Sequence, residues 1–301
     1  MFEPAVLAQI LWTGLATSSH MVLFTIAFAL VLKVVKLWNF AQAGMMAIAF
    51  YAMYAGVNQF GWPTLPSVGF GLALTLAATL ALERFGFRVL RARRSSSLLF
   101  FIFTLVCSEF AAYALTLIFG TEPAPLFERI LSPVRIVAGI AVSDWDLLAL
   151  GVTIGLATAL ALYLRFSSDG RCLVAVSDNA ELAELYGISA KRAYLIAFAL
   201  ASVLVCAGMY LYGTRTAVIP TAPLQLMIFA VIATLLGGMG SVLGAAIAAV
   251  TLSLLQSYSI LIVPSKWQGM ILYVFLFVTI LFFPSGAHPM RLLRRFGLRR
   301  G

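Results

Sequence analysis

The stretch AYLIAFALASVLVCAGMYLYG, residues 193–213, runs for 21 residues without a charged side chain. A helix of about 20 apolar residues is long enough to cross a hydrocarbon core of roughly 30 Å. Its apolar residues form an unbroken run, unlike the short alternating strands of an outer-membrane barrel. The stretch therefore predicts a transmembrane helix.

The rest of the chain has the same character. Of its 301 residues, 62% are hydrophobic and 10% are charged, whereas soluble domains are roughly half apolar and a quarter charged. Nine apolar runs are separated by charged or proline-rich breaks, at about 6–32, 40–57, 66–84, 97–119, 147–165, 193–213, 224–237, 241–260 and 267–283. We expect an all-α polytopic membrane protein with about eight to ten transmembrane helices, forming a single domain over residues 1–301.

The basic residues orient this chain in the membrane. Sixteen of the 20 lie in four clusters: Lys33 and Lys36; Arg84, Arg88, Arg91, Arg93 and Arg94; Arg165, Arg171, Lys191 and Arg192; and Arg291, Arg294, Arg295, Arg299 and Arg300. With the N-terminus outside, nine crossings place all four clusters in the cytoplasm, as the positive-inside rule requires. This predicts an exterior loop at about 120–146, a cytoplasmic loop at about 166–192 and a basic cytoplasmic tail at 287–301. We expect the basic tail to contact anionic lipid, with no nucleic-acid partner.

The cytoplasmic loop contains a short predicted helix. Asp178 or Ser177 is a suitable N-cap, and Gly187 is a suitable C′ residue. The helical residues between these ends are Asn179, Ala180, Glu181, Leu182, Ala183, Glu184 and Leu185. The result is a short amphipathic helix with acidic residues near its N-terminus, where the helix dipole favours them.

Enzyme signatures are missing from the sequence. It has no HExxH or CxxC motif, and its two histidines, His20 and His288, are far apart. The glycine-rich stretch at 237–241 lacks the Gly-Lys-Ser/Thr of a phosphate-binding loop. We therefore expect a protein that is not an enzyme, with no cofactor, no metal and no ATPase site of its own.

A few polar residues within the spans are candidates for a translocation path. Glu109 and His20 are the ionisable ones, and such residues are costly in a membrane unless they serve a function or find partners. Asn39 and Gln42 are three positions apart, on one helical face at the start of the second span. For each of the four, a place beside the path and an ordinary hydrogen bond within the bundle both remain open.

Small residues gather near the eighth span. Gly237, Gly238, Gly240 and Gly244 include a Gly-x-x-x-Gly spacing from 240 to 244. Such a pattern indicates close packing of helices.

Four stretches together resemble the permease subunits of bacterial ABC importers for branched-chain amino acids, the LivH and LivM type. They are NFAQAG at 39–44, RVLRARRSSS at 88–97, DGRCLVAVSDNAELAELYGISAKRAYLIAFALASVLVCAGMYLYG at 169–213, and TLLGGMGSVLGAAIAA at 234–249. Ala43 and Gly44 depart from the family's usual Gly-Glu, and Ala248 stands where another glycine is common. The third stretch is the most specific of the four.

The resemblance implies a permease of the bacterial inner membrane, with its C-terminus in the cytoplasm. It would pair with a second permease, rest on two ATP-binding subunits and receive solute from a periplasmic or lipid-anchored binding protein. The helix between Asp178 and Gly187 would be the coupling helix, with Leu182 and Leu185 filling a groove of the ATPase while Glu181 and Glu184 meet basic residues at its rim.

A secondary transporter that works without an ATPase is the alternative function. It predicts several paired ionisable residues within the spans for ion coupling, and Glu109 is essentially the one acidic candidate. The ATP-driven importer is therefore the favoured hypothesis.

Overall fold

A computed structural model of the chain describes residues 4–127, 133–137 and 139–261, with single positions and pairs between 264 and 281. Most of the predicted span 267–283 and the whole basic tail 287–301 lie outside the described residues. The α-helices of the described part are α1 Pro4–Val35, α2 Ala41–Tyr54, α3 Thr64–Ala81, α4 Arg88–Ala92, α5 Ser97–Phe119, α6 Asp144–Phe166, α7 Ser168–Asp178, α8 Ala180–Leu185, α9 Ala190–Arg215, α10 Ala222–Gly237 and α11 Val242–Ser259. Two π-helical turns, η1 Ala55–Gln59 and η2 Leu82–Phe87, continue α2 and α3.

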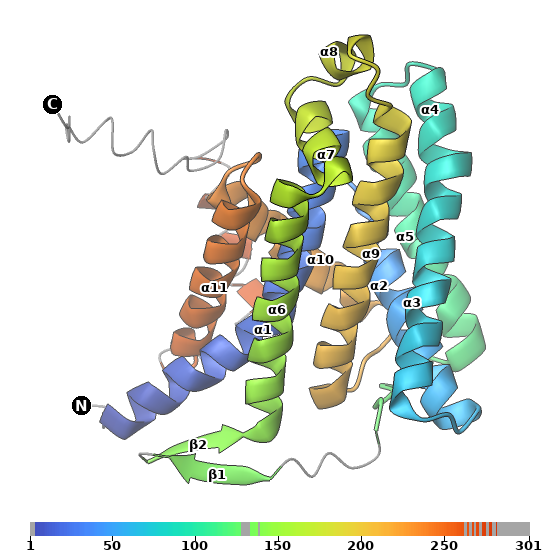
Figure 1. Cartoon of the computed structure of the whole chain (residues 1–301). Helices are drawn as coiled ribbons and strands as arrows, with labels where there is room; N and C mark the ends of the chain where they lie inside the picture. Colours follow the sequence, from blue (N-terminus) through green and yellow to red (C-terminus); the bar gives the residue numbers. More distant parts are fainter. Residues whose placement is uncertain are drawn as a thin grey trace, which may run out of the picture.

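The predicted all-α polytopic bundle is confirmed. Eight of the nine predicted spans coincide with helices of the described part, and six of these helices are long and apolar enough to cross a membrane. The helices run lengthwise between two ends of the molecule (Figure 1). We call the end that carries α4, α7 and α8 the basic end, and the opposite one the hairpin end.

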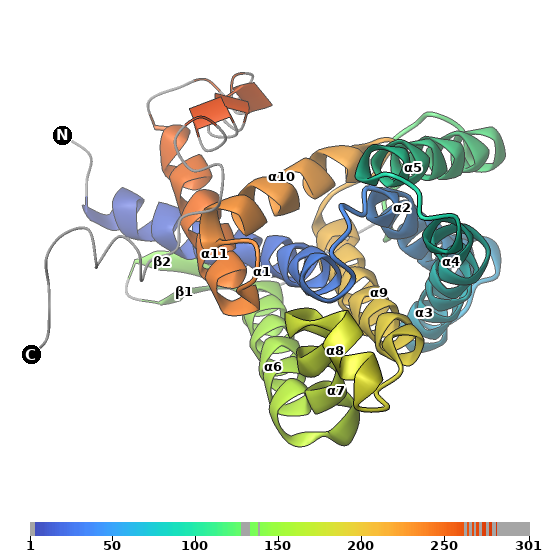
Figure 2. The same cartoon turned by 90° about the horizontal axis from the view of Figure 1, so that it is seen from above.

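Helix α1 is the centre of the bundle. It packs against α6, α7, α9, α10 and α11, most extensively against α11, and it lies between them when the molecule is viewed from above (Figure 2). Its fully buried side chains point in several directions around the helix and include Leu23, Phe24, Ala27 and Phe28. A helix that is apolar all round becomes buried on all sides, and α1 is buried in this way over most positions from Val22 to its end at Val35.

Helix α10 is shorter than its neighbours. Its 16 residues span about 24 Å at 1.5 Å per residue, less than a hydrocarbon core of roughly 30 Å. It is buried from Leu226 to Leu235 along most of its length, against α1, α2 and α11. The predicted span at 224–237 is therefore a short helix that other helices enclose.

A two-stranded antiparallel hairpin closes the hairpin end. Strands β1 Val134–Val137 and β2 Ile140–Ser143 pair with Val134 opposite Ser143, within the predicted exterior loop at 120–146. Helix α6 begins at Asp144, inside that loop, and Trp145 is 7% exposed. Arg215 lies over the face of the Trp145 ring, 4.7 Å from its centroid, and contributes to this burial.

Two glycines allow α10 and α11 to pack closely against each other. A Cβ added to Gly237 would overlap the backbone of Gly244 and Ala245, and one added to Gly244 would overlap the carbonyl of Gly237. Gly238 ends α10 with φ +95°. Gly240 lies in the turn between the two helices with open space around it. Of the four glycines predicted to pack helices closely, Gly237 and Gly244 thus make the close contact, and Gly240 does not.

Replacing Gly244 with Ala should therefore destabilise the bundle, whereas Gly240→Ala should not. The added methyl group meets backbone that cannot rotate away, at a cost of about 1–3 kcal/mol. Thermal unfolding of the two purified variants in detergent measures the difference. Equal melting temperatures of the two variants would contradict a close contact between α10 and α11 at Gly244.

Candidate functional site

A polar cavity of about 210 Å³ lies between α1 and α11. Its polar lining comes from two short stripes, Thr13, Thr17 and His20 on α1 and Ser253, Gln256 and Ser257 on α11, with Met21 and Ile260 completing the wall. Both stripes have the spacing of one helical face. No side chain of this lining is acidic or basic apart from the imidazole, so the cavity presents hydroxyl and amide groups.

Two buried polar atoms of this lining lack partners. His20 is 7% exposed and Ser253 is 5% exposed, and neither the Nδ1 of His20 nor the Oγ of Ser253 has a hydrogen-bond partner among the residues that the structure describes. A buried polar group without a partner costs free energy. Both residues belong to the cavity wall, but the two unpaired atoms have almost no accessible surface, so a water or solute in the cavity would reach them only after neighbouring side chains move.

The other predicted path residues lie elsewhere. Gln42 is buried, and its Nε2 donates to the carbonyl of Phe24 on α1 at 3.3 Å. Asn39 is also buried, four residues after the end of α1. Gln42 thus makes the ordinary hydrogen bond between helices that the sequence left open, although its Oε1 and the Oδ1 of Asn39 find no partner in the described part of the chain.

Glu109 lies on the outer face of α5. It is exposed, as are the neighbouring apolar side chains of Val106, Phe110 and Tyr113, and α5 packs mainly on α2. Among the described residues the buried carboxylates are instead Glu83, which pairs with Arg91, and Asp146. The structure therefore brings none of Asn39, Gln42 and Glu109 to the cavity that His20 lines.

The predicted helix of the cytoplasmic loop is present as α8. The side chain of Asn179 caps it by accepting from the N–H of Leu182 at 3.0 Å, and Gly187 follows it with φ +81°. The prediction of Asp178 or Ser177 as the cap is wrong, because both residues belong to a preceding helix, α7. That helix was missed, although Leu173 and Val176, three residues apart, are its buried apolar positions of the kind that helical spacing predicts, beside the buried Gly170 and Ser177.

Helix α8 stands at the tip of the basic end (Figure 1). Ala183 faces inward, whereas Leu182 is 51% and Leu185 is 84% exposed. Glu181 and Glu184 are exposed as well. The described part of the chain leaves these apolar and acidic side chains uncovered on a short, doubly capped helix.

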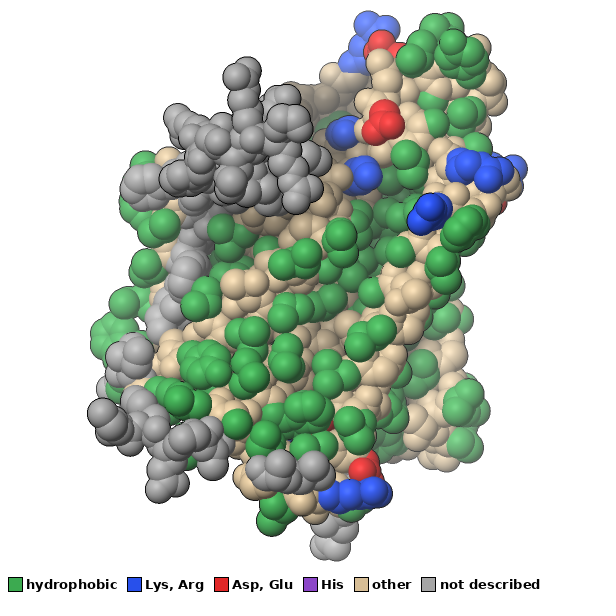
Figure 3. Space-filling view, turned by 60° about the vertical axis from the view of Figure 1, so that its left-hand side comes forward, with side chains coloured by type: hydrophobic (Ala, Val, Ile, Leu, Met, Phe, Trp, Pro, Cys, Tyr) green, Lys and Arg blue, Asp and Glu red, His purple; other side chains and the backbone are tan. Residues whose placement is uncertain are grey.

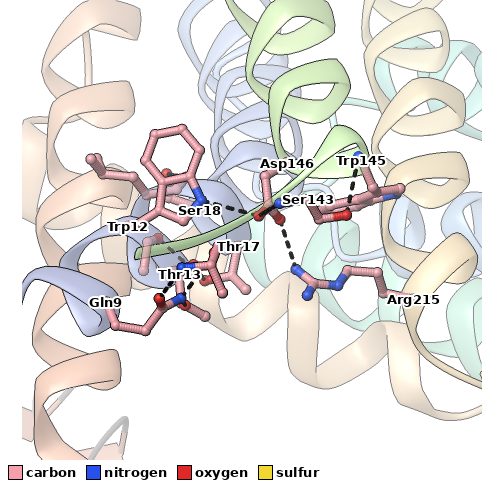
Figure 4. A network of polar contacts seen from close by, with 12 residues as sticks. Gln9, Trp12, Thr13, Thr17, Ser18, Ser143, Trp145, Asp146 and Arg215 are labelled. Carbon is pink, nitrogen blue, oxygen red and sulfur yellow. Dashed lines mark hydrogen bonds and ion pairs between the residues drawn. The ribbon is translucent and has the colours of Figure 1, made fainter. Parts of the chain in front are cut away.

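A buried carboxylate joins three helices at the hairpin end (Figure 4). Asp146 of α6 accepts from the Nε1 of Trp12 at 3.1 Å and from Arg215 at 3.2 Å. It also accepts from the backbone N–H of Ser143 at 3.0 Å, as part of a capping box. The side chain of Gln9 pairs with the backbone of Ala141 through both its oxygen and its nitrogen, so α1, β2, α6 and α9 are held together here.

Sequence reasoning missed most of these residues. The stripe Ser253, Gln256 and Ser257 repeats at three and four positions within an apolar helix, and this spacing was the available signal. The pairing of Asp146 with Arg215 joins residues 69 positions apart, so it left no local pattern. Within the described residues, no group of three or more His, Cys, Asp or Glu is placed to hold a metal ion.

This geometry defines a class: a helical membrane protein with a polar cavity between two spans and a short exposed helix at one end. A family model described as "Branched-chain amino acid transport system / permease component" matches residues 10–281. The chain belongs to this family.

Individual relatives are similar over nearly the whole length. BraD, a high-affinity branched-chain amino acid transport system permease protein of Pseudomonas aeruginosa, is 23% identical over 92% of this chain and 94% of its own. LivH of Escherichia coli K12, described in the same words, is 24% identical with the same coverage. The xylose transport system permease protein XylH of Haemophilus influenzae is 37% identical over 36% of this chain and 32% of its own.

A solved structure shares the fold. It is PsaBC from Streptococcus pneumoniae in complex with Fab, with a TM-score of 0.51, 13% identity and 94% of each chain covered. The identity is low, so this likeness supports the architecture alone.

Removing the carboxylate of Asp146 should loosen the hairpin end. Asp146→Ala leaves Trp12 and Arg215 without their acceptor and should cost about 2–4 kcal/mol. Asp144→Ala is the matched control, because its ion pair with Arg135 at 3.5 Å is exposed and should contribute about 0–1 kcal/mol. Thermal unfolding in detergent compares the two, and an equal loss would contradict a special role of Asp146.

Proposed function

We propose that this chain is the membrane-spanning permease subunit of an ATP-driven importer for branched-chain amino acids or a related small polar solute. The observation that carries the proposal is α8, a short capped helix that exposes Leu182 and Leu185 at the basic end. The sequence contains no phosphate-binding loop of its own. A permease without a nucleotide site needs such an element to receive force from a separate ATPase.

The charge of the two ends supports a cytoplasmic position of α8. Basic side chains gather at the upper, basic end, and hydrophobic ones dominate the middle of the molecule (Figure 3). The positive-inside rule then puts the basic end in the cytoplasm and the N-terminus outside, in the bacterial inner membrane. Two ATP-binding subunits would serve the importer, and the chain would need no cofactor of its own.

The platform beneath α8 supports transmission to the spans. Helix α7 packs against α1, α6 and α9, and Asp169 at its start pairs with Arg192 at the start of α9 at 3.1 Å. A force on α8 would therefore reach three spans through α7.

The exposed carboxylate of Glu109 supports a second permease subunit. An ionisable side chain on a face that otherwise shows Val106, Phe110 and Tyr113 is costly against hydrocarbon. A second permease on this face would remove Glu109 from lipid and place it beside a path between the subunits. A periplasmic or lipid-anchored binding protein would deliver the solute at the hairpin end.

The cavity between α1 and α11 supports a small polar solute. Its hydroxyl and amide groups, with His20 and Ser253 unpaired in the described structure, offer hydrogen bonds without a fixed charge. We propose that solute or its accompanying water passes this cavity.

Introducing positive charge on the exposed face of α8 should weaken the association of the permease with its ATPase subunits. Leu182→Arg or Glu181→Arg should reduce recovery of the ATPase subunits with the purified permease, and ATP-dependent uptake, by on the order of tenfold. Leu98→Arg is the control, because Leu98 is 66% exposed near the basic end and lies outside α8. ATP-independent uptake by the chain alone would instead support a secondary transporter.

Filling the polar cavity should slow uptake and leave assembly intact. Ser253→Val removes the unpaired hydroxyl and should lower the uptake rate roughly tenfold, with ATPase recovery unchanged. Thr251→Val is the control on the same helix, because Thr251 is exposed and bonds only to the carbonyl of Ile247. Normal uptake by the Ser253 variant would remove the cavity from the path.

A further inference from the structure

A larger cavity, of about 470 Å³, opens between the end of α3 and the start of α9. Its lining combines basic and apolar side chains: Leu80, Glu83, Arg84, Arg88, Lys191, Leu195, Ile196 and Ala199. It shares no residue with the polar cavity between α1 and α11.

The cations of this cavity are unpaired within the described structure. Arg84, Arg88 and Lys191 are exposed, and none of them is within ion-pair distance of a described carboxylate. Glu83 is buried and already forms an ion pair with Arg91. The accessible lining of the cavity is almost entirely apolar, so the three cationic side chains line it chiefly through their carbon atoms and carry their charge at its rim.

The apolar wall lies on the membrane side of these cations. Helix α3 and η2 run toward the basic end, so Leu80 is deeper in the bundle than Arg84 and Arg88. Helix α9 runs away from that end, so Leu195 and Ala199 are deeper than Lys191. Both walls change from basic to apolar in the same direction.

A second cavity extends the basic part outward. It has a volume of about 390 Å³, shares Arg84 and Arg88 with the first, and adds Arg93 beside Phe85 and Val89. A ligand held by the shared arginines has room for a head group larger than a single phosphate.

We propose that this cavity binds an anionic phospholipid from the leaflet at the basic end. Its phosphate lies among Arg84, Arg88 and Lys191, and an acyl chain follows Leu80, Leu195 and Ala199 into the membrane. Basic pockets between transmembrane helices are suited to acidic head groups, and the aligned apolar wall suits an acyl chain. The lipid would contact both α3 and α9, and α9 begins at Ala190, shortly after α8 ends at Leu185. Lipid binding at this cavity does not depend on ATPase docking at α8.

The test titrates the full-length protein in neutral detergent with phosphatidylglycerol and, separately, with phosphatidylcholine of the same acyl chains. Native mass spectrometry counts the bound lipids. Phosphatidylglycerol should bind about tenfold more tightly, and Arg84→Gln/Arg88→Gln/Lys191→Gln should abolish the preference. Lys36→Gln/Arg94→Gln/Arg171→Gln removes the same charge from exposed residues outside the cavity and should retain it.

A second variant tests the apolar wall without changing charge. Ala199→Trp should fill the acyl-chain part of the cavity and weaken phosphatidylglycerol binding, while glycerol 3-phosphate at millimolar concentration should not displace the lipid. Single Arg88→Gln gives a milder charge variant if the triple variant fails to fold.

Three results would overturn the proposal. Equal loss of preference in both triple variants would mean general surface attraction. Full displacement by glycerol 3-phosphate, with no effect of Ala199→Trp, would mean a site for soluble phosphate. Loss of ATPase recovery with unchanged lipid binding would mean that the three cations form a protein-docking surface.

Discussion

Hydrocarbon offers no hydrogen bonds, and this constraint governs every polar side chain in the spans. Most of them satisfy it locally: Thr25, Thr75 and Thr234 each donate to the carbonyl four residues earlier in their own helix. Against that pattern, the unpaired His20 and Ser253 stand out, because the two occur together on one cavity.

The same constraint explains the division of α1 into two parts. From Leu23 to Val35 the helix is enclosed by other helices and is almost entirely apolar. Near the hairpin end it carries Thr13, Thr17 and His20, where α11 approaches closely because Gly14 has no side chain: an added Cβ would come within 2.9 Å of the Ser257 hydroxyl. The central helix thus supplies both the packing core and one wall of the polar cavity.

Hydropathy predicted the spans because the membrane imposes their length and apolar character one segment at a time. It could not predict how segments meet. Asp178 and Asn179 are both suitable caps, and the choice fell to Asn179 because α7 continues through Asp178 while Leu173 and Val176 are buried. Trp145 has the character of an interfacial residue, yet Arg215, 70 positions later in the sequence, covers it. Glu109 was recognised as unusual from its sequence context, but the face on which it lies depends on the packing of α5 against α2.

The two ends of the molecule use charge in opposite ways. At the hairpin end, Asp146 is turned inward and ties α1, α6 and α9 together through Trp12 and Arg215. At the basic end, Arg84, Arg88 and Lys191 are exposed, and α8 projects beyond them. Helices α6 and α9 reach both ends, since α7 contacts each of them near α8 and Asp146 with Arg215 joins them at the far side. Helices α6 and α9 are therefore linked at both ends of the molecule, through α7 at the basic end and through the ion pair of Asp146 with Arg215 at the hairpin end.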